Sequence, residues 1–98
     1  MFKKVNGSES NGTHFQGYLR ASVSDLYVAF GEPSYRSDDK DDKTQYEWVL
    51  KFDDKIVATI YDYKEYRQFD TADVLQFHIG GFDKRAVNEV KYAFNGRI

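Results

Sequence analysis

Hydrophobic and polar residues alternate over residues 44–52, a pattern typical of a β-strand with one buried face. The large apolar residues occupy every second position, so they share one face when the chain is extended. We expect this face to lie in the core, and it carries Tyr46, Trp48, Leu50 and Phe52. The opposite face then carries Gln45, Glu47, Val49 and Lys51.

The next apolar segment, residues 56–63, predicts the return strand of a β-hairpin. A three-residue turn places Trp48 opposite Ile60 and keeps apolar partners on one face. A two-residue turn would place Trp48 opposite Tyr61 and turn the core side of one strand outward. We therefore predict the three-residue turn, and an exposed face of the return strand that carries Val57, Thr59, Tyr61 and Tyr63.

A strand and a helix are predicted before this hairpin. Residues 14–19 indicate a strand with Phe15, Gly17 and Leu19 on one side and Gln16 and Tyr18 on the other. The helix signals are Ser22 and Asp25 as a capping box, apolar residues at helical spacing up to Phe30, and Gly31 with Pro33 as the stop.

A strand and a helix are also predicted after the hairpin. Residues 74–79 alternate, with His78 on the exposed face, and the pair Gly80 and Gly81 predicts a turn. Asp83 is the expected N-cap of a second amphipathic helix that ends near residue 95.

The order of these elements is β-α-β-β-β-α, which predicts an α+β fold. Two amphipathic helices and an antiparallel sheet are expected to form two layers, with both helices on one face of the sheet and the other face open. Residues 1–12 show little periodicity and predict a flexible N-terminal arm, so the single domain is expected to span residues 13–98.

Composition excludes several classes of function. A chain of 98 residues is one domain, too short for separate cofactor and substrate domains. The absence of cysteine excludes disulfides, zinc–thiolate sites and thiol catalysis. The formal net charge of −2 argues against a dedicated nucleic-acid binder, which needs clustered Lys and Arg. The apolar runs are too short to span a membrane, so no membrane partner is expected.

Catalytic and metal-binding motifs are also absent from the sequence, so we expect no catalytic residues, metal or cofactor. The triplet that begins at Asp62 and ends at Lys64 resembles the acid-x-lysine end of a nuclease site, but an alternating strand end gives the same triplet. The glycines after His78 could admit an anion at the following helix, although Asp83 would compete for the same N–H groups. A small metal-dependent or anion-binding enzyme therefore stays as an alternative.

Aromatic residues are the most prominent feature, with 8 Tyr, 8 Phe and 1 Trp. Exposed rings on a sheet can anchor a protein partner or stack unpaired bases. We predict a protein-binding face that includes Glu47, Tyr61, Tyr63 and His78, with specificity added by the acidic loop residues Asp38, Asp39, Asp41 and Asp42. The alternative is single-stranded nucleic-acid binding, helped by Lys51, Lys64, Arg67, Lys84 and Arg85. A free sheet edge could also form a homodimer.

The chain contains the strings EWVLKF at 47–52, ATIYDYK at 58–64 and HIGG at 78–81. With these strings it resembles small accessory proteins encoded by bacteriophages. The resemblance implies a non-enzymatic binder, located in the cytoplasm of the infected bacterium, that inhibits or redirects a host protein. The expected targets are a defence component, such as a CRISPR–Cas or restriction system, or a host polymerase.

Overall fold

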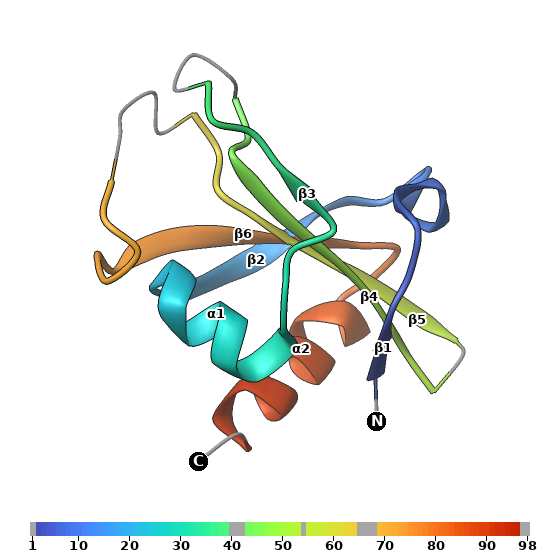
Figure 1. Cartoon of the computed structure of the whole chain (residues 1–98). Helices are drawn as coiled ribbons and strands as arrows, with labels where there is room; N and C mark the ends of the chain where they lie inside the picture. Colours follow the sequence, from blue (N-terminus) through green and yellow to red (C-terminus); the bar gives the residue numbers. More distant parts are fainter. Residues whose placement is uncertain (1, 40–42, 54, 65–68, 97–98) are drawn as a thin grey trace.

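Both helices pack on one face of a six-stranded antiparallel sheet, as Figure 1 shows. The structure is a computed structural model that describes residues 2–39, 43–53, 55–64 and 69–96. The elements are β1 (Phe2–Lys4), the 3-10 helix η1 (Gly7–Ser10), β2 (His14–Ala21), α1 (Val23–Phe30), β3 (Tyr35–Arg36), β4 (Tyr46–Phe52), β5 (Ile56–Tyr61), β6 (Leu75–Gly81) and α2 (Arg85–Asn95). The predicted α+β class and helix placement are confirmed.

The strands lie in the order β1-β4-β5-β6-β2, and β3 pairs with β4. In the central hairpin, Phe52 pairs with Ile56 and Trp48 pairs with Ile60, which confirms the predicted register. The sheet has an inner face, which the helices cover, and an outer face that points away from them. Tyr61 and Glu47 pair directly and lie on the outer face.

The inner face and the helices enclose one core. Its buried members are Leu19, Ala21, Val23, Leu26, Phe30, Trp48, Leu50, Phe52, Ala58, Ile60, Leu75, Phe77, Ile79, Ala86, Val90 and Phe94. The capping box at Ser22 and Asp25 forms as predicted. At the other end of α1, Gly31 has φ of 81° and its carbonyl accepts a hydrogen bond of 2.8 Å from Nε1 of Trp48. The largest core side chain is thereby tied to the end of a helix.

The N-terminal residues differ from the predicted flexible arm. Residues 2–4 form β1 against β4, and the Phe2 ring packs at 5.2 Å from Phe30 and 5.9 Å from Phe52. A three-residue strand is too short to show alternation, which explains why the sequence pattern missed it. The η1 helix then packs on β4 and β5, where Val49 and Val57 of the outer face are buried.

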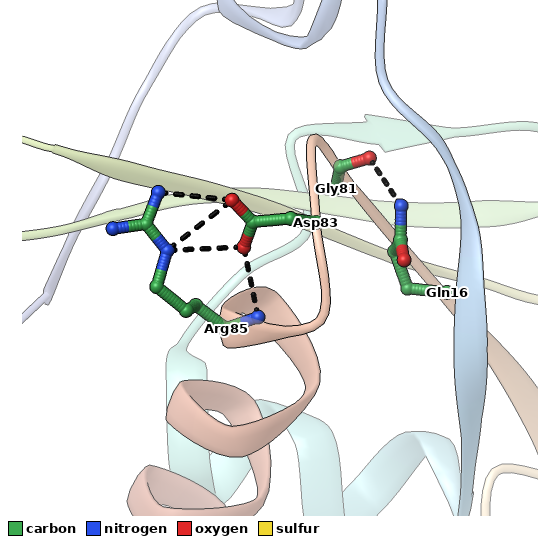
Figure 2. Close-up of polar contacts among 4 residues, drawn as sticks. All are labelled: Gln16, Gly81, Asp83 and Arg85. Carbon is green, nitrogen blue, oxygen red and sulfur yellow. Dashed lines mark hydrogen bonds and ion pairs between the residues drawn. The ribbon is translucent and has the colours of Figure 1, made fainter.

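A β-bulge in β2 changes the side of the strand on which Phe15 lies. Phe15 pairs with Gly80 and Gly17 pairs with Ile79, so Gln16 is the extra residue between them. The Gln16 side-chain amide donates a 3.0 Å hydrogen bond to the Gly81 carbonyl (Figure 2). The expectation that Phe15 lies on the same side of the strand as Leu19 and opposite to Tyr18 was therefore wrong, because Phe15 and Tyr18 both lie on the outer face.

The predicted turn at Gly80 and Gly81 was also wrong, because both residues belong to β6. Gly80 pairs with Thr59 of β5, and a Cβ at Gly80 would lie 2.5 Å from the Thr59 hydroxyl oxygen. A Cβ at Gly81 would collide with Ala86 of α2. Glycine is required here by close approach of neighbouring elements rather than by a turn.

The start of α2 lies slightly later than predicted. The helix begins at Arg85, with Lys84 at the N-cap position, whereas Asp83 was the expected N-cap. The Asp83 carboxylate nevertheless accepts a 2.9 Å hydrogen bond from the Arg85 N–H and pairs with the Arg85 guanidinium, also at 2.9 Å (Figure 2). The carboxylate therefore occupies the place that an anion would need at this helix end.

A buried carboxylate holds the open end of the central hairpin. Asp62 is 1% exposed, and its two oxygens accept hydrogen bonds of 2.9 and 3.1 Å from the Gln45 N–H. One of these oxygens also accepts a 2.7 Å hydrogen bond from the Tyr46 N–H. Asp62 thus ties the end of β5 to the start of β4, and these contacts assign it a structural role.

Replacement of Asp62 by alanine should destabilise the protein strongly, because the buried N–H of Gln45 and the partly buried N–H of Tyr46 would lose this acceptor. We expect the free energy of unfolding to fall by about 3 kcal/mol in urea titrations. Asp73→Ala is the matched control, since Asp73 is exposed and accepts one backbone N–H, from Asp70. The control should lose less than about 1 kcal/mol. Equal losses in the two variants would contradict the role given to Asp62.

Candidate binding face

One row of directly paired residues crosses the outer face at right angles to the strands. Tyr35 of β3 pairs with Glu47 of β4, and Glu47 pairs with Tyr61 of β5. Tyr61 pairs with His78 of β6, and His78 pairs with Tyr18 of β2. Directly paired residues share a face, so this transverse row spans five strands and about 19 Å, at about 4.8 Å per strand.

The imidazole of His78 lies at the centre of a cluster of rings. Its centroid is 5.1 Å from those of Phe15, Tyr18 and Tyr63, and 5.4 Å from that of Tyr61. These distances are typical of favourable aromatic pairs. We call these five residues the aromatic face. The contacts hold rings from β2, β5 and β6, together with Tyr63 beyond the end of β5, in one fixed group.

The aromatic face is also accessible. Phe15 is 48% exposed, Tyr18 is 47% exposed and Tyr63 is 39% exposed. The other end of the outer face differs, because η1 packs there and Val49 and Val57 are buried. The N-terminal segment therefore closes one part of the sheet and leaves the aromatic part open.

Burial perturbs the titratable groups of the transverse row. Burial raises the pKa of Glu47 above its ordinary value. The pKa of the Tyr61 phenol is raised by burial first, then by the negative charge of Glu47 and by Tyr63. Burial lowers the pKa of His78, which favours the neutral imidazole at physiological pH. The row thus presents neutral rings around one half-buried carboxyl group.

The Glu47 carboxyl group lines an open depression together with Tyr35, Lys43 and Thr44. Within the described part of the chain, its oxygens form no hydrogen bond and no ion pair, including with Lys43. Arg36 lies elsewhere, over the Tyr46 ring and paired with Asp38 at 3.5 Å. Among the described residues, this half-buried carboxylate therefore has no cation partner.

The structure brings together four of the predicted site residues and separates others from them. Glu47, Tyr61 and His78 are in the transverse row, and the Tyr63 ring contacts His78. Asp38 lines a different depression, with Arg36, Ser37, Gln45, Tyr46 and Phe69. Asp39 is exposed, and its N–H donates to the Ser37 hydroxyl. Asp41 and Asp42 lie outside the described residues.

Three residues of this surface were not among the predicted site residues. Tyr18 was expected on the side of its strand opposite to Leu19, but the placement of β2 beside β6 was needed to bring it to His78. Phe15 depends on the bulge at Gln16. Tyr35 lies on a strand of two residues, which is too short to be recognised from its sequence.

The basic residues considered for nucleic-acid binding are dispersed and engaged. Lys51 pairs with Glu9 at 3.3 Å, and Arg85 pairs with Asp83. Lys84 donates to the Gln16 carbonyl at 2.8 Å, and the Lys64 ammonium lies 5.2 Å from the Tyr63 ring centroid. Arg67 lies outside the described residues. Each of these four described cations therefore already has a contact within the protein.

Among residues 2–39, 43–53, 55–64 and 69–96, no group of three or more His, Asp or Glu side chains could hold a metal ion. In the same residues, neither helix has the length and apolar character required to cross a membrane.

Comparison with protein-family models, with curated proteins and with solved structures found no match to this chain. The candidate site therefore has to be judged by its own geometry and chemistry.

Replacement of Glu47 by glutamine should stabilise the protein at neutral pH. Because burial raises the pKa of Glu47 in the folded state, ionisation costs stability as the pH rises through the unfolded and then the folded pKa. Below both values the carboxyl group is neutral in both states, so this cost vanishes. Urea unfolding at several pH values should show an advantage of E47Q over the wild type that grows from about pH 4 to pH 7. An advantage that shrinks with rising pH would contradict this assignment.

Proposed function

We propose that this protein is a non-enzymatic binding module that docks a protein partner through the aromatic face. The observation that carries the proposal is the packing of Phe15, Tyr18, Tyr61 and Tyr63 around His78 on the open part of the sheet. Tyrosine supplies a large contact area with few rotatable bonds, so its immobilisation on binding costs little entropy. The mutual ring contacts reduce that cost further, because the rings are already ordered.

The electrostatics of the face favour a protein over a nucleic acid. Glu47 lies in the transverse row between Tyr35 and Tyr61, where its negative charge would repel a phosphate backbone. Of the cations weighed for nucleic-acid binding, Lys51 and Arg85 already have carboxylate partners. A protein surface, in contrast, can match both a carboxylate and a group of rings.

We further propose that the partner is a protein of a bacterial host and that binding inhibits or redirects it. This part of the proposal rests on the resemblance to phage accessory proteins carried by residues 47–52, 58–64 and 78–81. A module of this size acts by occupying a surface that the partner needs for another contact. A standard interface buries about 800 Å² on each partner, which a chain of this size can provide.

Single-stranded nucleic acid is the second candidate, because rings exposed on a sheet are also the arrangement that stacks unpaired bases. Arg20 of β2 and Lys64 are the described cations nearest in sequence to the rings of Tyr18 and Tyr63. This candidate predicts binding of labelled oligonucleotides that weakens steeply with salt. If the wild type binds oligonucleotides and Tyr18→Ala does not, the function of this face is nucleic-acid binding rather than protein binding.

The double variant Tyr18→Ala with Tyr63→Ala should lose partner binding and keep its fold. Both side chains are substantially exposed, and each central ring of an interface contributes about 2 kcal/mol, so affinity should fall by at least about 30-fold. Immobilised wild-type and variant proteins are compared for capture from bacterial host lysate, and the affinity for the captured protein is then measured by calorimetry.

The matched control is Val28→Ala with Tyr92→Ala, which removes side chains that are 76% and 82% exposed on the helix layer. This control should bind like the wild type, and circular dichroism should show that both double variants remain folded. If only the control variant fails to capture the partner, the docking surface lies on the helices and the proposal is refuted.

A further inference from the structure

We propose that the depression lined by Tyr35, Lys43, Thr44 and Glu47 is an arginine-recognition site, in which Glu47 receives the guanidinium group of a partner's arginine side chain. The inference rests on the proposed function, since it names the chemistry of a partner residue that meets the transverse row. It concerns the end of the row opposite to Tyr18, and it shares Tyr61 with the ring cluster around His78.

Three neighbours on one face build this site. Glu47 is paired directly with Tyr35 on one side and with Tyr61 on the other, so a tyrosine flanks the carboxylate on each side. Directly paired side chains have Cβ atoms about 5 Å apart, which brings the phenol rings within reach of a group bound at the carboxylate. Tyr35 is 46% exposed and the depression opens to solvent, so a partner side chain can enter.

No cation of the described residues pairs with the Glu47 carboxylate. The carboxylate has no ion pair among these residues, and burial is the cause of its raised pKa. Lys43 lines the same depression without pairing with it. Burial deprives the Glu47 carboxylate of part of its hydration. An ion pair with an incoming cation would offset this loss, and the attraction between the two charges is stronger in a partly desolvated site than in water.

The flanking rings favour arginine over lysine. A guanidinium group is planar, can bind a carboxylate through two parallel hydrogen bonds and can stack on a tyrosine face. Its weak hydration makes transfer into a half-buried site less costly than the transfer of an ammonium group. The protein uses a related contact elsewhere, where the Arg36 guanidinium lies 5.7 Å from the centroid of the Tyr46 ring.

The test uses N-acetylarginine amide as the probe, with N-acetylcitrulline amide as its uncharged analogue of the same shape. Binding is followed by NMR through the Glu47 side-chain carboxyl signal and the ring signals of Tyr35 and Tyr61. We expect saturable shifts with the arginine probe, at least about tenfold weaker binding of the citrulline probe, and a lower Glu47 pKa in the arginine complex. N-acetyllysine amide should bind several-fold more weakly than the arginine probe.

Two variants make the assignment specific. E47Q should remain folded and lose the preference for arginine over citrulline, since the negative charge is gone. K43Q should bind the arginine probe about twofold more tightly, since a nearby like charge is removed. Equal binding of the arginine and citrulline probes, equal binding of the lysine probe, unchanged arginine preference in E47Q, or weaker binding in K43Q would each overturn the inference.

Failure here can be separated from failure of the proposed function. Partner capture that depends on Tyr18 and Tyr63, together with no response to the arginine probe, would refute the arginine site and leave the docking face in place. A specific response to the arginine probe, together with capture that ignores Tyr18 and Tyr63, would refute the docking face and leave the arginine site.

Discussion

The burial of Trp48 is the constraint on which the outer face depends. Its indole is fully buried beneath the helices, and its Nε1 donates to the Gly31 carbonyl at the end of α1. Because side chains alternate along a strand, an inward Trp48 requires an outward Glu47. Directly paired residues share a face, so Tyr61, His78 and Tyr18 also lie on the outer face. A shift of β4 by one residue would put the indole in water and dismantle the transverse row.

The two halves of the outer face then differ because the N-terminal segment covers one of them. η1 packs on β4 and β5 in this half, where Val49 and Val57 are buried. The other half keeps its rings and Glu47 in contact with water. Exposed residues are usually polar, and buried charges are usually paired. Residues that depart from these preferences are expected mainly at functional sites. Exposed Phe15 and half-buried Glu47 both break it, and both lie on the open half.

The features predicted correctly from the sequence are those set by local periodicity. The hairpin register follows from the alternation around Trp48, and the capping box at Ser22 follows from side-chain spacing. The errors arise where contacts with elements distant in the sequence determine the local structure. The glycines at 80 and 81 belong to a strand because Thr59 and Ala86 approach them, and the face of Phe15 depends on a bulge that the Gln16 amide completes. In the site, alternation alone placed Glu47, Tyr61 and His78 on one face, but their pairing with Tyr18 and Tyr35 required the sheet order and a two-residue strand.

The transverse row has two chemically different ends, and this difference bears on how a partner would sit. At the His78 end, rings from three strands contact one another, and dehydration of these rings would supply affinity without a strong directional preference. At the Tyr35 end, a single carboxylate lies between two phenols, so it would favour a partner that places one positive charge at this position. The two ends lie on one rigid sheet, so a partner that satisfies both can bind in one orientation. A partner with rings alone could slide along the row, whereas under the proposed function the charged end would fix the register of the contact.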